Sequence, residues 1–198
     1  STPEEAVAYF RGLLEGTPKS REAATYGLVL ALTAASRTGE AALALDDIWS
    51  DKSDRIEYVI ADADIALAQG NAQLASDKLR KRLSLSPGNH PLTMAYAHAL
   101  QQSGNAYLAE EVLLAQSQRQ SNDPNLWYLL AEVQGLSGNI VGLHRSRAEY
   151  FIKVGNFDAA KRQLDYALQL IGNDFTTSSQ IHERLNDVLT MRAALEQQ

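Results

Sequence analysis

The chain has 198 residues, with 18 Lys and Arg against 24 Asp and Glu, a net charge of −6 and no Cys. This length suffices for a hydrophobic core in one domain or two small ones, and a hydrophobic content of 45% excludes wholesale disorder. The acidic balance argues against a nucleic-acid partner, and the lack of Cys excludes disulfides and thiolate zinc sites. The longest apolar run, residues 26–35, is too short to cross a bilayer, so we expect no membrane span.

The first predicted element is a helix that begins at Pro3. The segment Thr2-Pro3-Glu4-Glu5 is a capping box with Pro at the first helical position, and Gly12 and Gly16 weaken and end the helix. No charged and apolar leader comes before these signals, so we expect a mature or excised chain.

Gly-Asn pairs recur through the middle of the chain. Gly70, Gly104 and Gly138 are each followed by Asn and are 34 residues apart, and Gly155-Asn156 follows after 17 residues, half that period. Gly tolerates the left-handed conformation that ends a first helix, and Asn caps the start of a second helix. We therefore predict antiparallel helix pairs joined at these turns.

Aligned on the glycines, the repeats begin at Glu22, Ile56, His90 and Pro124, and in the first repeat Ser36 replaces Gly. Small or apolar residues recur at two further positions of the alignment. They are Ala63, Ala97 and Ala131 in the first helices and Ala75, Ala109, Leu143 and Ala160 in the second helices. We expect Ala109 to be buried where the two helices of its repeat cross.

A 34-residue period with this spacing is typical of the tetratricopeptide repeat. The predicted fold is an all-α tetratricopeptide (TPR) helical solenoid of about eleven antiparallel helices with a C-terminal capping helix. The alternative is a helical bundle with accidental periodicity. The capping helix is expected from Ser178 to Leu195, where apolar residues recur at intervals of three and four.

The half-period step between Gly138 and Gly155 makes one helix, from Asn139 to Val154, close one repeat and open the next. Because this exchanges first and second helices, we predict a change of curvature there. The single domain, residues 1–198, would then have two arms, 20–120 and 125–196.

Signatures of catalysis are missing from the sequence. The four His are scattered, and His182-Glu183-Arg184 lacks the second His that a zinc-binding helix requires. The acid pairs Asp46-Asp47 and Glu110-Glu111 are interpreted as solvated surface, and so is the basic run 78–82 at the end of a second helix. We expect that this chain is not an enzyme and that it binds no metal or cofactor.

A binding role remains, carried by the first helices, which line the inner face in this class of repeat. The candidate partner-binding groove consists of first-helix residues together with two residues of the half-step helix. They are Tyr26, Ile60, Asp64, Met94, His98, Gln101, Tyr128, Glu132, Arg145 and Glu149. The alternative is that some of them only pack helices together. We expect Tyr128, with Glu132 and Tyr26, to line a hollow between the arms.

Both ends of the chain resemble one family. The N-terminal residues are Thr2-Pro3-Glu4-Glu5-Ala6, Tyr9-Phe10, Ala24 and Tyr26-Gly27-Leu28. The C-terminal residues are His144, Arg147-Ala148-Glu149-Tyr150-Phe151, Gly155, Ala160, Gln163-Leu164, Ala167-Leu168, Asp174-Phe175 and Ile181-His182-Glu183-Arg184-Leu185. They resemble the region after the catalytic domain in periplasmic zinc metallopeptidases of Gram-negative bacteria, the beta-barrel assembly-enhancing protease family.

The resemblance implies a non-catalytic interaction domain in the periplasm. It would recruit or present outer-membrane β-barrel proteins and their assembly machinery for quality control, and it would contact its own peptidase domain. That domain would carry the HExxH zinc site, so zinc is expected there and not in this chain. The alternative is a free-standing TPR adaptor or chaperone without an attached enzyme.

Overall fold

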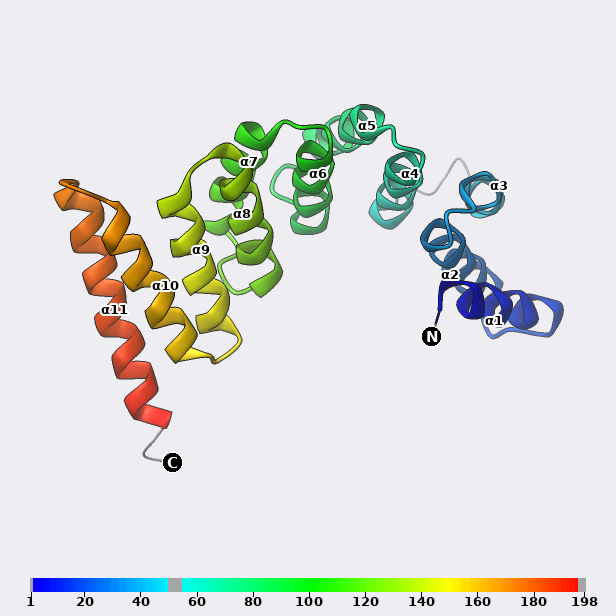
Figure 1. Cartoon of the computed structure of the whole chain (residues 1–198). Helices are drawn as coiled ribbons and strands as arrows, with labels where there is room; N and C mark the ends of the chain where they lie inside the picture. The colour runs from blue at the N-terminus through cyan, green and yellow to red at the C-terminus, as the bar shows by residue number, and fades with distance from the viewer. Residues whose placement is uncertain (1, 50–54, 196–198) are drawn as a thin grey trace. The chain divides into compact units, whose positions relative to one another are not determined.

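The computed structural model describes residues 2–49 and 55–195, and these form eleven α-helices and no strand. The helices are α1 Pro3–Glu15, α2 Arg21–Ala34, α3 Thr38–Ile48, α4 Ile56–Ala68, α5 Ala72–Leu85, α6 His90–Gln102, α7 Ala106–Ser117, α8 Pro124–Ser137, α9 Ile140–Lys153, α10 Phe157–Leu170 and α11 Phe175–Leu195 (Figure 1). The predicted all-α fold class is confirmed.

The repeat register is confirmed at its helix starts. The helices α4, α6 and α8 begin at Ile56, His90 and Pro124 as predicted, and α2 begins one residue before Glu22. Gly70 has φ +77°, and Ser36 adopts the same left-handed region with φ +59°. Ser36 thus takes the place of glycine in the first repeat, at the strain that a side chain carries in this region.

The small positions of the repeats are buried. Every alanine that the alignment placed there, Ala109 included, is at most 1% exposed, whereas Leu143 is half-buried. The predicted burial of Ala109 is therefore confirmed, and its position where the two helices of its repeat cross stays a prediction. Side chains of this size let paired helices pack closely, which is the physical reason for the repeat pattern.

The contacts divide the chain into two compact units, Ser1–Ser103 and Gly104–Gln198. We call them unit 1 and unit 2 and describe each by itself. The predicted single domain, its arms over 20–120 and 125–196 and the change of curvature stay predictions.

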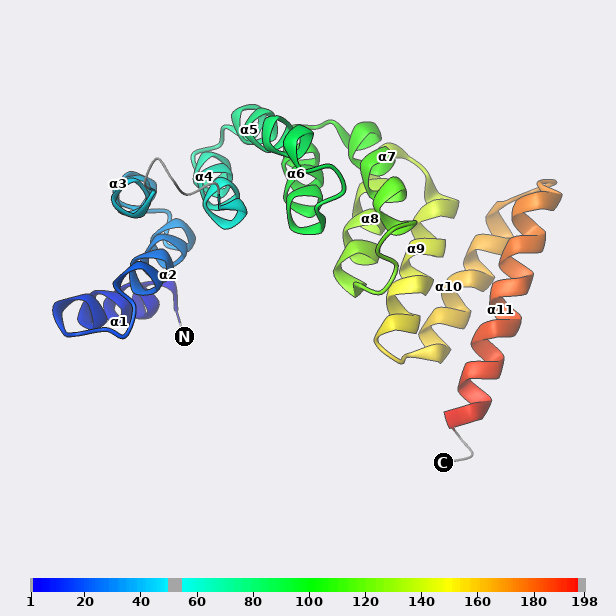
Figure 2. The same cartoon turned by 180° about the vertical axis from the view of Figure 1, so that it is seen from behind.

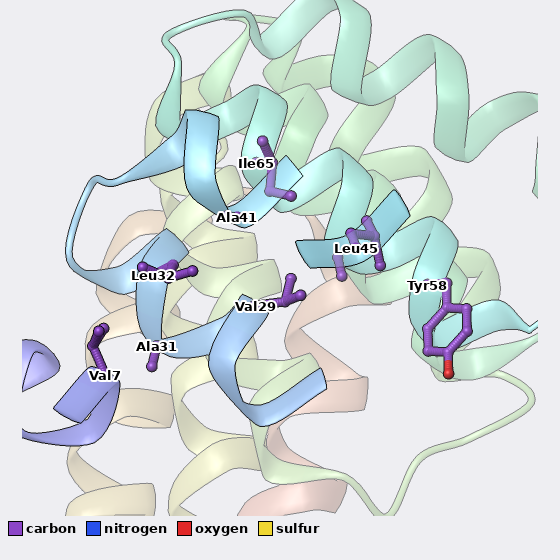
Figure 3. Close-up of a cluster of buried hydrophobic side chains, with 9 residues drawn as sticks. Val7, Val29, Ala31, Leu32, Ala41, Leu45, Tyr58 and Ile65 are labelled. Carbon is purple, nitrogen blue, oxygen red and sulfur yellow. The ribbon is translucent and has the colours of Figure 1, made fainter. Parts of the chain in front are cut away.

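In unit 1, α2 packs against both α1 and α3, and α4 contacts α2, α3, α5 and α6. A core of buried side chains joins the first four helices, with Val7, Val29, Leu45, Tyr58 and Ile65 among its members (Figure 3).

Helix α1 packs closely against α2 at Gly27. The ring of Phe10 lies where a Cβ atom on Gly27 would be, because a built Cβ comes 2.2 Å from its Cε1 atom. Glycine inside a helix lowers the stability of that helix by about 1 kcal/mol relative to alanine. At Gly27 this loss allows the aromatic ring of Phe10 to pack against the backbone of α2.

In unit 2, helices α7 to α11 each pack against the next one along the chain. Helix α9 has substantial contacts with both α8 and α10, and the second core cluster, with Ala148, Ala160, Leu164 and Ile181, joins α9, α10 and α11. Figures 1 and 2 both show α10 and α11 side by side.

The closing helix begins three residues earlier than Ser178. Asp174 accepts a hydrogen bond from the backbone N–H of Thr177 at 3.0 Å, and α11 starts at Phe175. The backbone and side-chain hydrogen bonds of Thr177 hold the pKa of Asp174 below its ordinary value. Asp174 therefore caps the N-terminus of α11, which the spacing of apolar residues alone did not indicate.

We expect Gly27→Ala to lower the free energy of unfolding by about 1–2 kcal/mol, because the new methyl group displaces the ring of Phe10. In a Phe10→Ala background, the same substitution should instead raise it by up to about 1 kcal/mol, since only the helix propensity then changes. Urea unfolding of the four proteins measures this reversal of sign.

Gly12→Ala is the matched control, because apart from the two adjacent residues and the nearby backbone of its own helix no atom lies within 4 Å of the position of its Cβ. It should be neutral or stabilising. If Gly27→Ala is stabilising with Phe10 present, the proposed docking of α1 is wrong.

Candidate protein-interaction surfaces

Three neighbouring first helices of unit 1 present one set of side chains. In the repeat register, Tyr26, Ile60 and Met94 occupy the fifth position of α2, α4 and α6, and Asp64 and His98 occupy the ninth position of α4 and α6. Residues four apart lie on the same face of a helix. Helix α4 contacts both α2 and α6, so these positions are adjacent.

One member of this set is not among the residues predicted from the sequence. Leu30 occupies the ninth position of α2 and is 44% exposed, and the register that identified Asp64 also identifies it. We call the set Tyr26, Leu30, Ile60, Asp64, Met94 and His98 the first-helix face. Gln101, the remaining predicted residue of this unit, lies further along α6 and is half-buried.

Asp64 carries the negative charge of the first-helix face. Its half-buried position raises the pKa of its carboxyl above the ordinary value, and the nearby His98 opposes the shift. Burial and the charge of Glu57 raise the pKa of Tyr26, and the charge of Asp64 makes a smaller contribution in the same direction. Asp64 of α4 therefore interacts electrostatically with one group on each neighbouring helix, Tyr26 of α2 and His98 of α6.

Unit 2 contains a hollow of about 640 Å³ lined by residues of α7 to α11 and the segments that join them. Arg145 and Glu149 of α9 line it, together with Leu114 of α7 and Gln180 and Arg184 of α11. We call it the α9 hollow. Its walls combine aliphatic side chains with charged groups, as in sites that bind a partner by apolar contact and orient it by polar contact.

Two interactions span the α9 hollow from α9 to α11. Arg184 donates from Nε and Nη2 to the two carboxylate oxygens of Glu149 at 2.6 and 2.7 Å, and Arg145 donates to Gln180 Oε1 at 3.1 Å. The hydrogen bonds that Arg184 donates to Glu149 raise the pKa of Arg184. Bidentate pairing fixes both the distance and the orientation of the two helices.

Tyr128 and Glu132 line a different depression of about 240 Å³, formed by α8, α9 and α10. Tyr128 is 56% exposed, and its ring centroid lies 5.7 Å from that of Tyr150. Arg147 lies 3.9 Å from the Glu132 carboxylate. Apart from Gln101, the predicted residues are thus found at the first-helix face, the α9 hollow and this depression, and their role in binding stays a prediction.

The interpretation of Glu110-Glu111 as solvated surface is wrong for Glu110. Its carboxylate is half-buried and accepts hydrogen bonds from Gln134 Nε2 at 3.3 Å, Ser137 Oγ at 2.6 Å and Asn139 Nδ2 at 2.6 Å. Ser146 of α9 then donates to Gln134 Oε1 at 2.7 Å. The physical reason is that α7 packs against α8, which brings these donors to Glu110, whereas Glu111 is exposed.

Other charged and imidazole side chains interact with polar side chains of their own unit. Lys78, the first residue of the basic run, donates to Asp62 at 2.6 Å, and His144 lies 2.8 Å from Gln163 Oε1. No group of three or more potential metal ligands occurs among residues 2–49 and 55–195. In the same ranges, no helix has the length and apolar content that crossing a membrane requires.

Removing the Glu149–Arg184 pair should destabilise unit 2. The two side chains are only 19% and 29% exposed, so Arg184→Met leaves a poorly solvated carboxylate and should cost about 2 kcal/mol of unfolding free energy. The control, Lys161→Met, removes an exposed pair with Asp165 and should change it by less than about 0.5 kcal/mol. Equal effects in urea unfolding would contradict the role of Arg184.

Asp64→Asn should raise the free energy of unfolding at about pH 7. A carboxyl whose pKa is higher in the folded protein favours folding below its ordinary pKa of 3.8, and that advantage is lost as the pH rises through the higher value. The gain from Asn should therefore shrink to nothing as the pH falls below 3.8. Urea unfolding at a series of pH values measures this.

Asp62→Asn provides the comparison on the same helix, because it removes the partner of Lys78. It should give no gain in stability at either end of the pH range. A gain from Asp64→Asn that grows toward low pH would show that the sign is wrong.

Comparison with known proteins places the chain among repeat proteins. Residues 66–133 match the profile of the tetratricopeptide repeat. The chain is 27% identical over 146 residues to the beta-barrel assembly-enhancing proteases of Escherichia coli (strain K12) and Shigella flexneri. The match covers 74% of this chain and 30% of those proteins, so the chain spans under a third of the length of the curated relatives it matches.

Solved structures show the same fold at low sequence identity. MamA MSR-1 C2 gives a TM-score of 0.56 at 15% identity, covering 89% of this chain and 97% of that one. A tetratricopeptide repeat protein from Parabacteroides merdae gives 0.56 at 14%, covering 94% and 78%. TTC0263, a thermophilic TPR protein of Thermus thermophilus, gives 0.55 at 16%, covering 95% and 91%. The fold of this chain is a tetratricopeptide helical solenoid.

Proposed function

We propose that this chain is the non-catalytic protein-interaction domain of a periplasmic zinc metallopeptidase of the beta-barrel assembly-enhancing kind. It would recruit or present outer-membrane β-barrel proteins and their assembly machinery for quality control. The observation that carries the proposal is the 27% identity over 146 residues to proteases of that name. The zinc and the catalytic residues would belong to a peptidase domain outside this sequence.

The architecture supports an interaction role for the chain. A tetratricopeptide solenoid presents rows of side chains from successive helices, and such surfaces bind protein segments. The α9 hollow offers about 640 Å³ in which aliphatic and charged side chains converge. A site of this composition suits an incompletely folded polypeptide, whose apolar side chains are still available for contact.

Photo-crosslinking in the periplasm of a Gram-negative host tests the proposal. A photoreactive residue at Gln180, which lines the α9 hollow, should give adducts with β-barrel proteins or their assembly machinery. The control position is Asn186, an exposed residue of the same helix that is outside the hollow lining. Adducts identified by mass spectrometry should depend on the Gln180 position.

The alternative function, a free-standing TPR adaptor or chaperone, predicts different results. The coding sequence on the N-terminal side of Ser1 would then encode no HExxH peptidase domain, and Gln180 adducts would contain other proteins. Absence of barrel and assembly proteins from the Gln180 adducts would contradict the proposed function.

A further inference from the structure

The carboxylate of Asp64 differs from those of Asp62, which is also half-buried, and of the exposed Glu22. Asp62, two residues before it on α4, is paired with Lys78 at 2.6 Å, and Tyr58 donates to Glu22. Within the part of the chain that the structure describes, no hydrogen bond or ion pair reaches Asp64, and its electrostatic neighbours are Tyr26 and His98. Burying a charge that accepts no hydrogen bond is unfavourable, so this position lowers stability, and the nearby His98 offsets the cost only in part.

The side chains around Asp64 on the first-helix face are mostly apolar. Ile60 is one turn before it on α4, Leu30 and Tyr26 belong to α2, and Met94 belongs to α6. Leu30 is 44% exposed and the other three are partly exposed. An apolar surface with a single carboxylate suits a long aliphatic stem that ends in a cation, which describes the side chains of lysine and arginine.

Apart from His98, which interacts with Asp64 electrostatically, the cations Arg55 and Lys78 of unit 1 are engaged with other groups. Arg55 lies 2.9 Å from Glu22 and is stacked over the ring of Tyr58, and Lys78 is held by Asp62. Glu57 adds a second negative charge near Tyr26. The local charge therefore favours a cation supplied by another molecule, and the Tyr26 ring adds a surface on which such a cation can stack.

We propose that the first-helix face binds polypeptide segments in which an arginine or lysine is flanked by apolar side chains, with the cation pairing with Asp64. This proposal rests on the function proposed above and specifies the chemistry of the partner at a site in unit 1. The apolar neighbours contact the flanking side chains, and Asp64 selects the basic residue. Asp64 thus confers specificity at a cost in stability.

Two peptides that differ only in one positive charge measure how much that charge contributes to binding. The probe is a fluorescein-labelled decapeptide with one arginine among leucine and serine residues, and its counterpart carries citrulline, a neutral analogue of nearly the same shape. Fluorescence anisotropy with the full chain should give about tenfold tighter binding of the arginine peptide. In Asp64→Asn, the two peptides should bind with affinities that agree within about twofold.

Asp62→Asn is the matched control, since it changes the net charge equally on the same helix but removes an acid already paired with Lys78. It should keep the preference for arginine. Circular dichroism should show all three proteins equally helical, and Asp64→Asn should be no less stable than the parent.

The proposal is overturned if neither peptide binds, if the parent binds both equally, or if Asp64→Asn keeps the preference. None of these results bears on the crosslinking from Gln180, which lies in unit 2. The failure of this site and the failure of the proposed function can therefore be told apart.

Discussion

The close approach of antiparallel helices is the constraint on which the rest of this structure depends. Two helix backbones come near one another only where the side chains between them are small, and Ala63, Ala75 and Ala160 are at most 1% exposed. The turn between paired helices must also reverse the chain within a few residues, which the left-handed residues at Gly70 and Ser36 achieve. Once both conditions hold, equivalent positions of successive helices fall in rows, and such rows form the first-helix face.

Local signals explain why most of the fold could be predicted. The helix starts at Ile56, His90 and Pro124 follow from the 34-residue period once the Gly-Asn pairs are aligned, so the sequence alone locates them. The docking of Phe10 against Gly27 could not be predicted in this way, because it joins two helices through the absence of a side chain. A glycine within an apolar run gives no indication of which ring will occupy the space beside it.

The candidate sites were harder to predict than the helices. Nothing next to Glu110 in sequence indicates that it accepts three hydrogen bonds, because its donors lie 24 to 29 residues further along the chain. The grouping of Arg145 and Glu149 with α11 likewise depends on how α9 packs, which a register of repeats leaves open. The register did identify equivalent positions of α2, α4 and α6, since residues at the same position of each repeat are equivalent, and the role of these positions in binding stays a prediction.

Glu110 and Asp64 show how the same chemical group takes two different roles. Both are half-buried carboxylates on helices, but Glu110 is surrounded by donors from α8 and the turn that follows it, whereas Asp64 has apolar neighbours. A satisfied carboxylate rigidifies its surroundings and is a structural element. An unsatisfied one retains the capacity to interact, at a cost to the folded state.

The position of α9 between α8 and α10 has a consequence for changing the length of this protein. In a solenoid with a period of two helices, first and second helices alternate, and the Gly-Asn turns at Gly138 and Gly155, 17 residues apart, enclose the single helix α9. Inserting or deleting a 34-residue pair would preserve which helices present their side chains to a partner. Inserting or deleting a single helix in unit 2 would exchange the lining helices for their neighbours and create a different binding surface from nearly the same sequence.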